Sequence, residues 1–187
     1  SEPVSQATFK VTKAFWGLDA SLASKKHFPS IHWLNSYSLY QENVEDYFTS
    51  KVASDWTELR DHAMSILQKE DELDDIVKLV GMDSLSSTDK VLLNTAQTLR
   101  EDYLQQDAFS DIDAFSSPRK MYLMLKAILT FHTTATEVIT NNPDIDPKIL
   151  ETLEIGQEIS NSSDITEDHL EHIQDLIDRI PEAIQSL

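Results

Sequence analysis

The chain has 187 residues, of which 40% are hydrophobic, so it is long enough to bury the core of one domain. It contains only 3 glycines and 6 prolines, too few turn residues for an all-β fold with many tight turns. The 33 acidic and 15 basic residues give a net charge of −18, which repels nucleic acid and anionic membranes and most often serves solubility alone.

The chain has no cysteine, so disulfides and thiolate metal sites are excluded, which is consistent with a reducing compartment. No run of about 18 apolar residues occurs, so we expect no direct insertion into a membrane. Residues 1–13 lack a basic start followed by an apolar run, so we expect no signal peptide. These observations predict a cytoplasmic protein that meets membranes only through a partner.

Residues 8–16 alternate between apolar and polar side chains, which predicts a β-strand. A single strand cannot satisfy its own backbone groups, so it either pairs with chain outside this sequence or is not a strand here. Residues 18–26 predict a short helix that ends before Pro29. Three aromatic residues then lie on irregular backbone: Phe28, Trp33 and Tyr37.

From residue 39 onward, apolar residues recur at three- and four-residue steps, which predicts helices. The first helix covers residues 39–52. The second begins at Ser54 or Asp55, bends at the acidic run 70–72, and ends at Gly81. Its last apolar positions are Leu73, Ile76, Val77 and Val80.

Two further helices have clear starting signals. Ser86, followed three residues later by Asp89, is a capping-box-like start for a helix that extends to about Gln106. Ser117 and Pro118 begin a helix that ends near residue 140. The methionines in this helix are more simply core residues than ligands.

The last third of the chain is less regular. We expect a short helix after Asp146, a polar linker over residues 156–164, and a final helix capped by Thr166 that stops near Pro181. The fold class is therefore mainly α: an antiparallel helical bundle preceded by a short non-helical or strand segment.

The residues alone indicate no catalytic site. The sequence lacks a glycine-rich phosphate loop, a GxSxG motif and an HExxH motif. His169 and His172 could share a helix face as metal ligands, but no third ligand is suggested nearby, so an exposed polar face explains them better. Function stays open at this level, with a free-standing acidic module that binds a basic helix as one reading.

Two stretches resemble the catalytic A subunit of archaeal A-type and vacuolar-type ATPases: FWGLDASLASKKHFPSIHWLNSYSLY (15–40) and REDYLQQDAF (100–109). MYLMLKAILTF (121–131) is similar to the same family. The resemblance implies that residues 1–35 end a RecA-like nucleotide-binding domain and that residues 36–187 form the C-terminal helical domain. Within the latter, the core bundle reaches about residue 140 and residues 141–187 form a variable tail. The strand would then belong to a sheet upstream.

The resemblance also implies part of an adenine pocket, because the phenylalanines of the HFP and QQxAF segments line it in this family. Residues 27–31 align with the GIYPAVDP segment of the related F-type β subunit, whose aromatic stacks on adenine. Aromatic faces hold such a ring by stacking and apolar burial. Gln105 or Gln106 could bind the edge of the base. The positions assigned to the pocket are Phe28, Pro29, Gln106, Phe109 and Phe115.

A second implied site is a rotor contact. The F-type β subunit carries GMDELSEEDK against the central rotor, and GMDSLSSTDK stands at residues 81–90 here. Only Asp83 and Asp89 remain of the acids, so we expect polar and apolar packing, by Met82 and Leu85, in place of a charge-driven contact. The loop 82–88 consists of Met82, Asp83, Ser84, Leu85, Ser86, Ser87 and Thr88.

The implied function is that of a rotary ATP synthase or ATPase that moves protons or sodium ions. ATP or ADP with Mg²⁺ would bind the whole catalytic protein. The implied partners are the B subunits that alternate with it in a ring, the central rotor stalk and the remainder of the A subunit. The phosphate loop, catalytic glutamate and magnesium site lie upstream of Ser1 in this family. The chain alone should therefore be inactive and bind no nucleotide tightly, and the complex should lie peripheral to the membrane.

Overall fold

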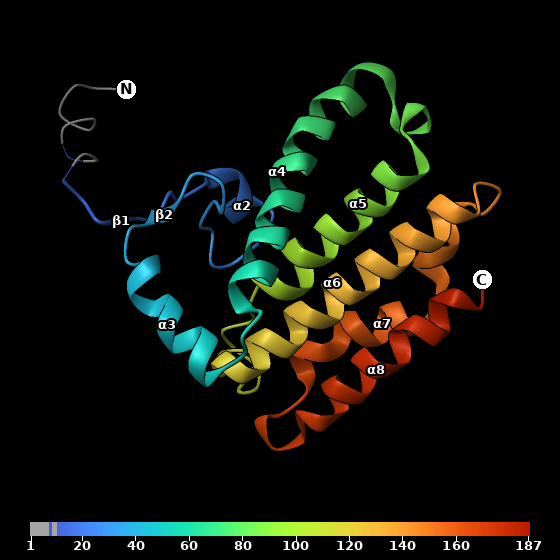
Figure 1. Ribbon diagram of the computed structural model, residues 1–187. Helices are drawn as coiled ribbons and strands as arrows, with labels where there is room; N and C mark the ends of the chain where they lie inside the picture. The colour runs from blue at the N-terminus through green and yellow to red at the C-terminus, as the bar shows by residue number, and fades with distance from the viewer. Residues whose placement is uncertain (1–7, 9–10) are drawn as a thin grey trace.

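The computed structural model describes residue 8 and residues 11–187, which form a helical bundle with a small two-stranded antiparallel sheet near the N-terminus on one side (Figure 1). The strands and helices, in order, are β1 (Ala14–Phe15), α2 (Ala20–Ser24), β2 (Tyr37–Ser38), α3 (Gln41–Lys51), α4 (Trp56–Val80), α5 (Ser87–Thr98), α6 (Pro118–Asn141), α7 (Glu154–Ser160) and α8 (Glu171–Gln185). Short 3-10 helices cover Met82–Ser84, Pro147–Thr152, Asn161–Asp164 and Glu167–His169, and a π-helical segment, Leu99–Leu104, continues α5. No helix in the described part of the chain is long and apolar enough to cross a membrane.

Helix α6 is the centre of the bundle. It packs against α4, α5, α7 and α8, and Figure 1 shows it lying between α5 and α8. A helix that is apolar on most of its circumference must be covered on all sides. Accordingly, Leu123, Met124 and Leu125, consecutive residues that point in different directions from the helix axis, are all buried. The predicted mainly α fold is confirmed.

The capping residues fix two helix starts as the sequence predicts. The Asp89 N–H donates to Ser86 Oγ at 3.1 Å, and the Lys120 N–H donates to Ser117 Oγ at 3.0 Å. Each serine satisfies one of the backbone donors that the first turn of a helix leaves free. Helices α5 and α6 therefore begin directly after these residues.

The N-terminal strand is shorter than expected and is paired within the chain. Among the described residues of the stretch 8–16, only Ala14–Phe15 is strand, and it pairs antiparallel with Tyr37–Ser38. Thr8 is helical, and residues 9–10 of the predicted strand lie outside the described residues. The expectation that the strand lacks a partner inside this sequence is wrong for Ala14–Phe15.

Helix α4 also differs from the prediction. It runs through the acidic residues 70–72 as one uninterrupted helix of 25 residues. Its apolar stripe ends sooner than expected, because Leu73 is buried but Ile76 and Val80 are exposed. The end of α4 therefore projects beyond the core.

The C-terminal third is more ordered than its polar sequence predicts. The expected linker 156–164 is α7 followed by a 3-10 helix, and Ile155 and Ile159 bury one side of it. Lys120, itself fully buried, donates from Nζ to the Ser163 carbonyl at 2.6 Å and ties this segment to α6. Two apolar residues in an otherwise polar segment are enough for tertiary packing to stabilise a helix here.

The last helix neither begins nor ends where predicted. Thr166 precedes a 3-10 turn, α8 begins at Glu171, and the helix continues through Pro181 to Gln185. Proline in a helix interior removes one hydrogen bond, usually at a cost of about 3 kcal/mol. Ile180 and Ile184 on either side of it are completely buried, and their burial against α6 offsets that cost.

Candidate functional site

The first candidate site is built where the chain after α2 meets the chain after the π-helical segment. Helix α2 ends at Ser24, and Lys26 adopts a left-handed conformation with φ of 62°. The chain then reaches the cis peptide bond between Phe28 and Pro29. The Gln106 N–H donates to the Phe28 carbonyl at 2.7 Å. This bond brings together two segments that are 78 residues apart in sequence.

The loop after Gln106 is held by its own polar groups. The Asp107 N–H donates to Asp113 Oδ2 at 2.5 Å, and the Phe109 N–H donates to Asp107 Oδ1 at 2.9 Å. The Gln106 side-chain amide donates to the Asp113 carbonyl at 3.3 Å. The side-chain nitrogen of Gln106, Nε2, therefore donates within the loop. The side-chain oxygen is the atom that can accept a hydrogen bond from a base.

Three phenylalanine rings in this region face solvent. Phe28 is 50% exposed, Phe109 99% and Phe115 69%. Among the described residues, none of these three rings stacks on another aromatic ring. The structure therefore joins the Phe28 and Gln106 backbones but does not bring the three rings into contact. Three exposed aromatics on one loop pair are unusual for a surface without a partner.

A charged cluster that the sequence does not predict supports this region. Arg100, in the π-helical segment, donates from Nε to both carboxylate oxygens of Glu70 on α4, at 3.0 and 3.1 Å. Burial raises the pKa of Glu70, and Arg100 partly counters that rise. His27, directly before Phe28, is buried against Trp33, with 5.7 Å between ring centroids. Burial, followed by the nearby Arg100 charge, lowers the pKa of His27.

This cluster positions the aromatic segment against the bundle. Residues 27, 70 and 100 come from three separate elements, at least 30 residues apart, so no local spacing predicts their meeting. Nη2 of Arg100 also lies 3.0 Å from Glu70 Oε1, so two guanidinium nitrogens face the carboxylate and fix the Arg100 side chain in one orientation. The π-helical segment that precedes Gln106 is thereby anchored to α4.

The second candidate site is the turn between α4 and α5. Gly81 ends α4 with φ of 85°, a left-handed conformation that favours glycine. Met82–Ser84 form a single 3-10 turn, and Leu85 is buried against the bundle. Leu85 therefore packs within this chain, whereas Met82 is 47% exposed.

The exposed apolar surface at this end extends onto α4. Its members, here called the hairpin-tip patch, are Ile76, Leu79, Val80 and Met82. Leu79, 84% exposed, is the most prominent of them. Sequence periodicity assigns Ile76 and Val80 to the core and misses Leu79. The signal that could have found the patch is the spacing of Ile76, Leu79 and Val80, because residues at i, i+3 and i+4 share one face of a helix.

One continuous rod connects the two candidate sites. Helix α5 starts at the turn, and the π-helical segment carries the chain on to Leu104, two residues before Gln106. Rigid elements of this kind can transmit displacement between their ends.

The two histidines considered as metal ligands lie near the start of α8. Their rings, His169 and His172, stack with centroids 5.5 Å apart. No group of three histidine, aspartate or glutamate side chains in the described part of the chain is arranged to hold a metal ion.

Comparison with known proteins identifies the family. A family model described as the C-terminal domain of V and A type ATP synthase matches residues 45–149. The A subunit of the A-type ATP synthase of Methanosphaera stadtmanae is 48% identical over 181 residues, covering 96% of this chain and 31% of that protein. The V-type ATP synthase alpha chain of Clostridium botulinum is 47% identical over 187 residues, covering all of this chain and 31% of its own length.

A third relative agrees with these two. The A subunit of the A-type ATP synthase of Methanopyrus kandleri is 44% identical over 188 residues. In each case the chain spans 31% of the curated relative that it matches. The chain belongs to the family of C-terminal domains of V- and A-type ATP synthases.

Proposed function

We propose that this chain is the C-terminal portion of the catalytic A subunit of a rotary A/V-type ATP synthase, in which ATP synthesis or hydrolysis is coupled to movement of protons or sodium ions. It would supply part of the adenine pocket and carry movement to the central rotor stalk. The observation that carries the proposal is the hydrogen bond from the Gln106 N–H to the Phe28 carbonyl. It joins the two segments to which the family resemblance assigns adenine contacts.

The residues at this junction suit adenine chemically. Phe28, Phe109 and Phe115 offer exposed aromatic faces, and stacking on such faces holds a flat base. The carbonyl oxygen of the Gln106 side chain can accept from an amino group at the base edge, and Pro29 adds an apolar wall. The phosphates and Mg²⁺ would be held by the nucleotide-binding domain upstream, because the sequence here lacks a phosphate loop. Alone, this chain would not hydrolyse ATP.

The rotor contact would be made by loop 82–88 and the hairpin-tip patch. Met82, Leu79 and Val80 present apolar surface at the end of the α4–α5 hairpin. Asp83 and Ser84 are exposed beside them and can add polar contacts. Since the adenine end and the rotor end lie on one rod, nucleotide state would bias rotor position and rotor position would bias nucleotide affinity.

The remaining partners would be the B subunits that alternate with this one in a ring and the rest of the A subunit. The N-terminal region fits contact with the latter, because Val11, Trp16 and Leu18 remain 71–80% exposed although the strand itself is paired. A free-standing module would be expected to cover these side chains. The complex would lie on the cytoplasmic side, peripheral to the membrane.

The proposal is tested by nucleotide binding in the full-length catalytic protein, assembled with its B subunit. Phe109→Ala should weaken ATP binding by about 1–3 kcal/mol, the scale of a lost base–aromatic stack. Tyr47→Ala is a matched control, because Tyr47 is 54% exposed on α3 and has no proposed role at the nucleotide. Unchanged ATP affinity in Phe109→Ala, or an equal loss in Tyr47→Ala, would remove Phe109 from the adenine pocket.

A further inference from the structure

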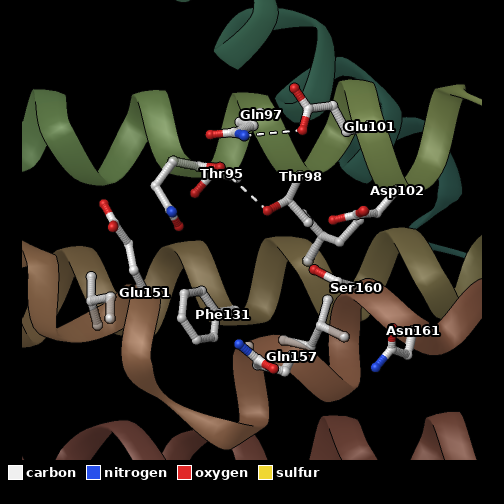
Figure 2. A pocket seen from close by; sticks show the side chains of 15 residues that line it. Thr95, Gln97, Thr98, Glu101, Asp102, Phe131, Glu151, Gln157, Ser160 and Asn161 are labelled. Atoms are coloured by element: carbon white, nitrogen blue, oxygen red, sulfur yellow. Dashed lines mark hydrogen bonds between the residues drawn. The ribbon is translucent and has the colours of Figure 1, made fainter. Parts of the chain in front are cut away.

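A polar groove lies on the side of the π-helical segment that faces α7 (Figure 2). Its volume is about 500 Å³, within the range of small-molecule sites. One wall is formed by α5 and the π-helical segment, and the opposite wall by α7 and residue 161. Figure 2 shows the Asp102 side chain directed from one wall toward Ser160 on the other, while the Thr98 hydroxyl donates to the Asn94 carbonyl of its own helix at 3.3 Å.

The floor of the groove is apolar. Phe131 and Ile128 of α6 line it from below, together with Leu150 and Ile159. The rim is polar and contains Gln97, Gln157 and Asn161. A ligand that fits this lining has an aliphatic part that packs on the floor and a polar part that meets the walls.

The charges of the groove have one sign. Its lining includes three carboxylates, Glu101, Asp102 and Glu151, and no lysine, arginine or histidine from the described part of the chain. At the rim, Glu101 accepts from the Gln97 side chain at 3.0 Å and forms a 3.9 Å ion pair with Arg100, which is not part of the lining. Asp102 is half-buried next to Ser160. The groove therefore favours a cation.

Asp102 has a different environment from the other half-buried carboxylate in this region. Glu70 is paired with Arg100 through two hydrogen bonds. Burial raises the pKa of Asp102, and the contact that counters this rise comes from the Ser160 hydroxyl. An entering cation would offset the cost of burying this carboxylate.

The backbone around Asp102 is also unusual. The Gln105 N–H donates to the Arg100 carbonyl at 3.1 Å, the five-residue step of a π-helix. Such turns are rare and are found frequently at functional sites. On the facing wall, Gly156 leaves the groove open.

We propose that this groove binds an alkylammonium group, with Asp102 as the deep carboxylate, Glu101 and Glu151 at the rim, and the methylene chain on Phe131 and Ile128. The same chemistry is offered by a free linear polyamine and by the lysine side chain of another protein. The groove lining contains none of the residues assigned to the adenine pocket and none of the hairpin-tip patch, so this proposal is independent of the proposed function.

Two variants test the site by separate means. Asp102→Asn removes the deep charge. Gly156→Leu adds bulk at the groove lining and changes no charge. The added Cβ would meet its nearest neighbours, the Leu150 carbonyl and the Phe131 ring, at 3.6 and 3.9 Å, which are ordinary contact distances. Asp144→Asn is the matched control, because it makes the same charge change at an exposed position outside the groove.

Binding of spermidine and of a short lysine-containing peptide to this chain is measured by calorimetry at about 0.15 M salt, where long-range surface attraction is screened. We expect one saturable site for at least one probe. Its affinity should fall by about tenfold or more in both Asp102→Asn and Gly156→Leu and stay unchanged in Asp144→Asn. The probe that saturates identifies the source of the ammonium group.

Two results would overturn the proposal. One is the absence of saturable binding of either probe to the unmodified chain. The other is binding that Asp144→Asn weakens as much as Asp102→Asn, or that Gly156→Leu leaves intact, because the protein's net negative charge would then explain it. Thermal unfolding of each variant checks that the fold persists. The two groove variants change the groove by unrelated means, one by removing a charge and the other by adding bulk.

Discussion

Thr95 on α5 and His132 on α6 are hydrogen-bonded inside the core, with 2.9 Å between Thr95 Oγ1 and His132 Nδ1. Both residues are buried. The Thr95 hydroxyl donates its proton to the Val91 carbonyl at 3.0 Å, so in this pair it accepts and His132 donates from Nδ1. The His62 ring of α4 stands edge-on to His132 with centroids 5.6 Å apart. A neutral imidazole thus links three helices.

The first prediction concerns acid sensitivity. Burial, followed by the charge of His62, lowers the pKa of His132 from its usual 6.5 to about 4. The unfolded chain therefore binds this proton at a higher pH than the folded one, so stability falls as pH decreases from about 6.5 toward 4. Through this residue alone, the loss should approach about 3 kcal/mol. Urea unfolding across this range measures it, and His132→Gln should flatten that part of the profile. An equally steep profile in His132→Gln would assign the effect to other groups.

A second prediction concerns the Arg100–Glu70 pair. Arg100→Met should lower the free energy of unfolding by about 2–4 kcal/mol at neutral pH, because it leaves the Glu70 carboxylate buried without its cation. Burial already raises the Glu70 pKa, and loss of Arg100 raises it further. Protonation removes the buried charge of Glu70 in Arg100→Met. Part of the lost free energy of unfolding should therefore be recovered as pH falls through the raised pKa of Glu70.

Denaturant unfolding of Arg100→Met at neutral and mildly acidic pH checks this recovery. The double variant Arg100→Met/Glu70→Gln is the control and should lose less stability than Arg100→Met alone. A double variant that is less stable than the single one would mean that Glu70 contributes through contacts other than this pair.

The third prediction concerns the start of α5. Ser86→Ala removes the acceptor of the Asp89 N–H and should cost about 1 kcal/mol. Ser87→Ala changes a neighbouring serine that is the first residue of the helix and does not cap it, so it should be nearly neutral. Thermal unfolding compares the two. Equal losses would show that the hydroxyl of Ser86 does not act as a cap.

The fourth prediction concerns Leu79 at the end of α4, which should matter for contact with a partner and not for the folding stability of this chain. Leu79→Ala should change the stability of this chain by less than about 0.5 kcal/mol, because the side chain is 84% exposed. Leu73→Ala, six residues earlier and 3% exposed, should cost about 2–5 kcal/mol. If the proposed function holds, Leu79→Ala in the assembled complex should weaken coupling between ATP hydrolysis and rotation, as measured by ion pumping per ATP. Unchanged coupling would exclude Leu79 from the proposed rotor contact.

Local signals in the sequence predict the helix starts well. Ser86 and Ser117 act through bonds to residues three positions away, so their spacing alone is informative. The nearly continuous apolar residues of α6 likewise correspond to its central, buried position. These features depend on few partners, and those partners are close in sequence.

The parts that the sequence does not predict depend on distant partners. Nothing in IGQEISNSSD (155–164) indicates that Ile155 and Ile159 will find an apolar neighbour, and nothing beside Pro181 indicates that Ile184 will be buried. The same holds at the candidate site, where the family resemblance supplies Phe28 and Gln106 but not the Arg100–Glu70 pair beneath them. The division of the chain near residue 35 stays a prediction.

The π-helical segment has a geometric consequence for the rod that joins the two ends of this domain. A π-turn holds one residue more than an α-helical turn but still carries the chain once around the helix axis. Deleting one residue between Leu99 and Leu104 would therefore tighten the segment to an α-helical turn and leave the chain after it in nearly the same direction relative to the hairpin tip. In the proposed enzyme, the wide turn thus adds one residue to the rod without changing the angle between the surface proposed to meet the rotor and the side from which Phe109 projects.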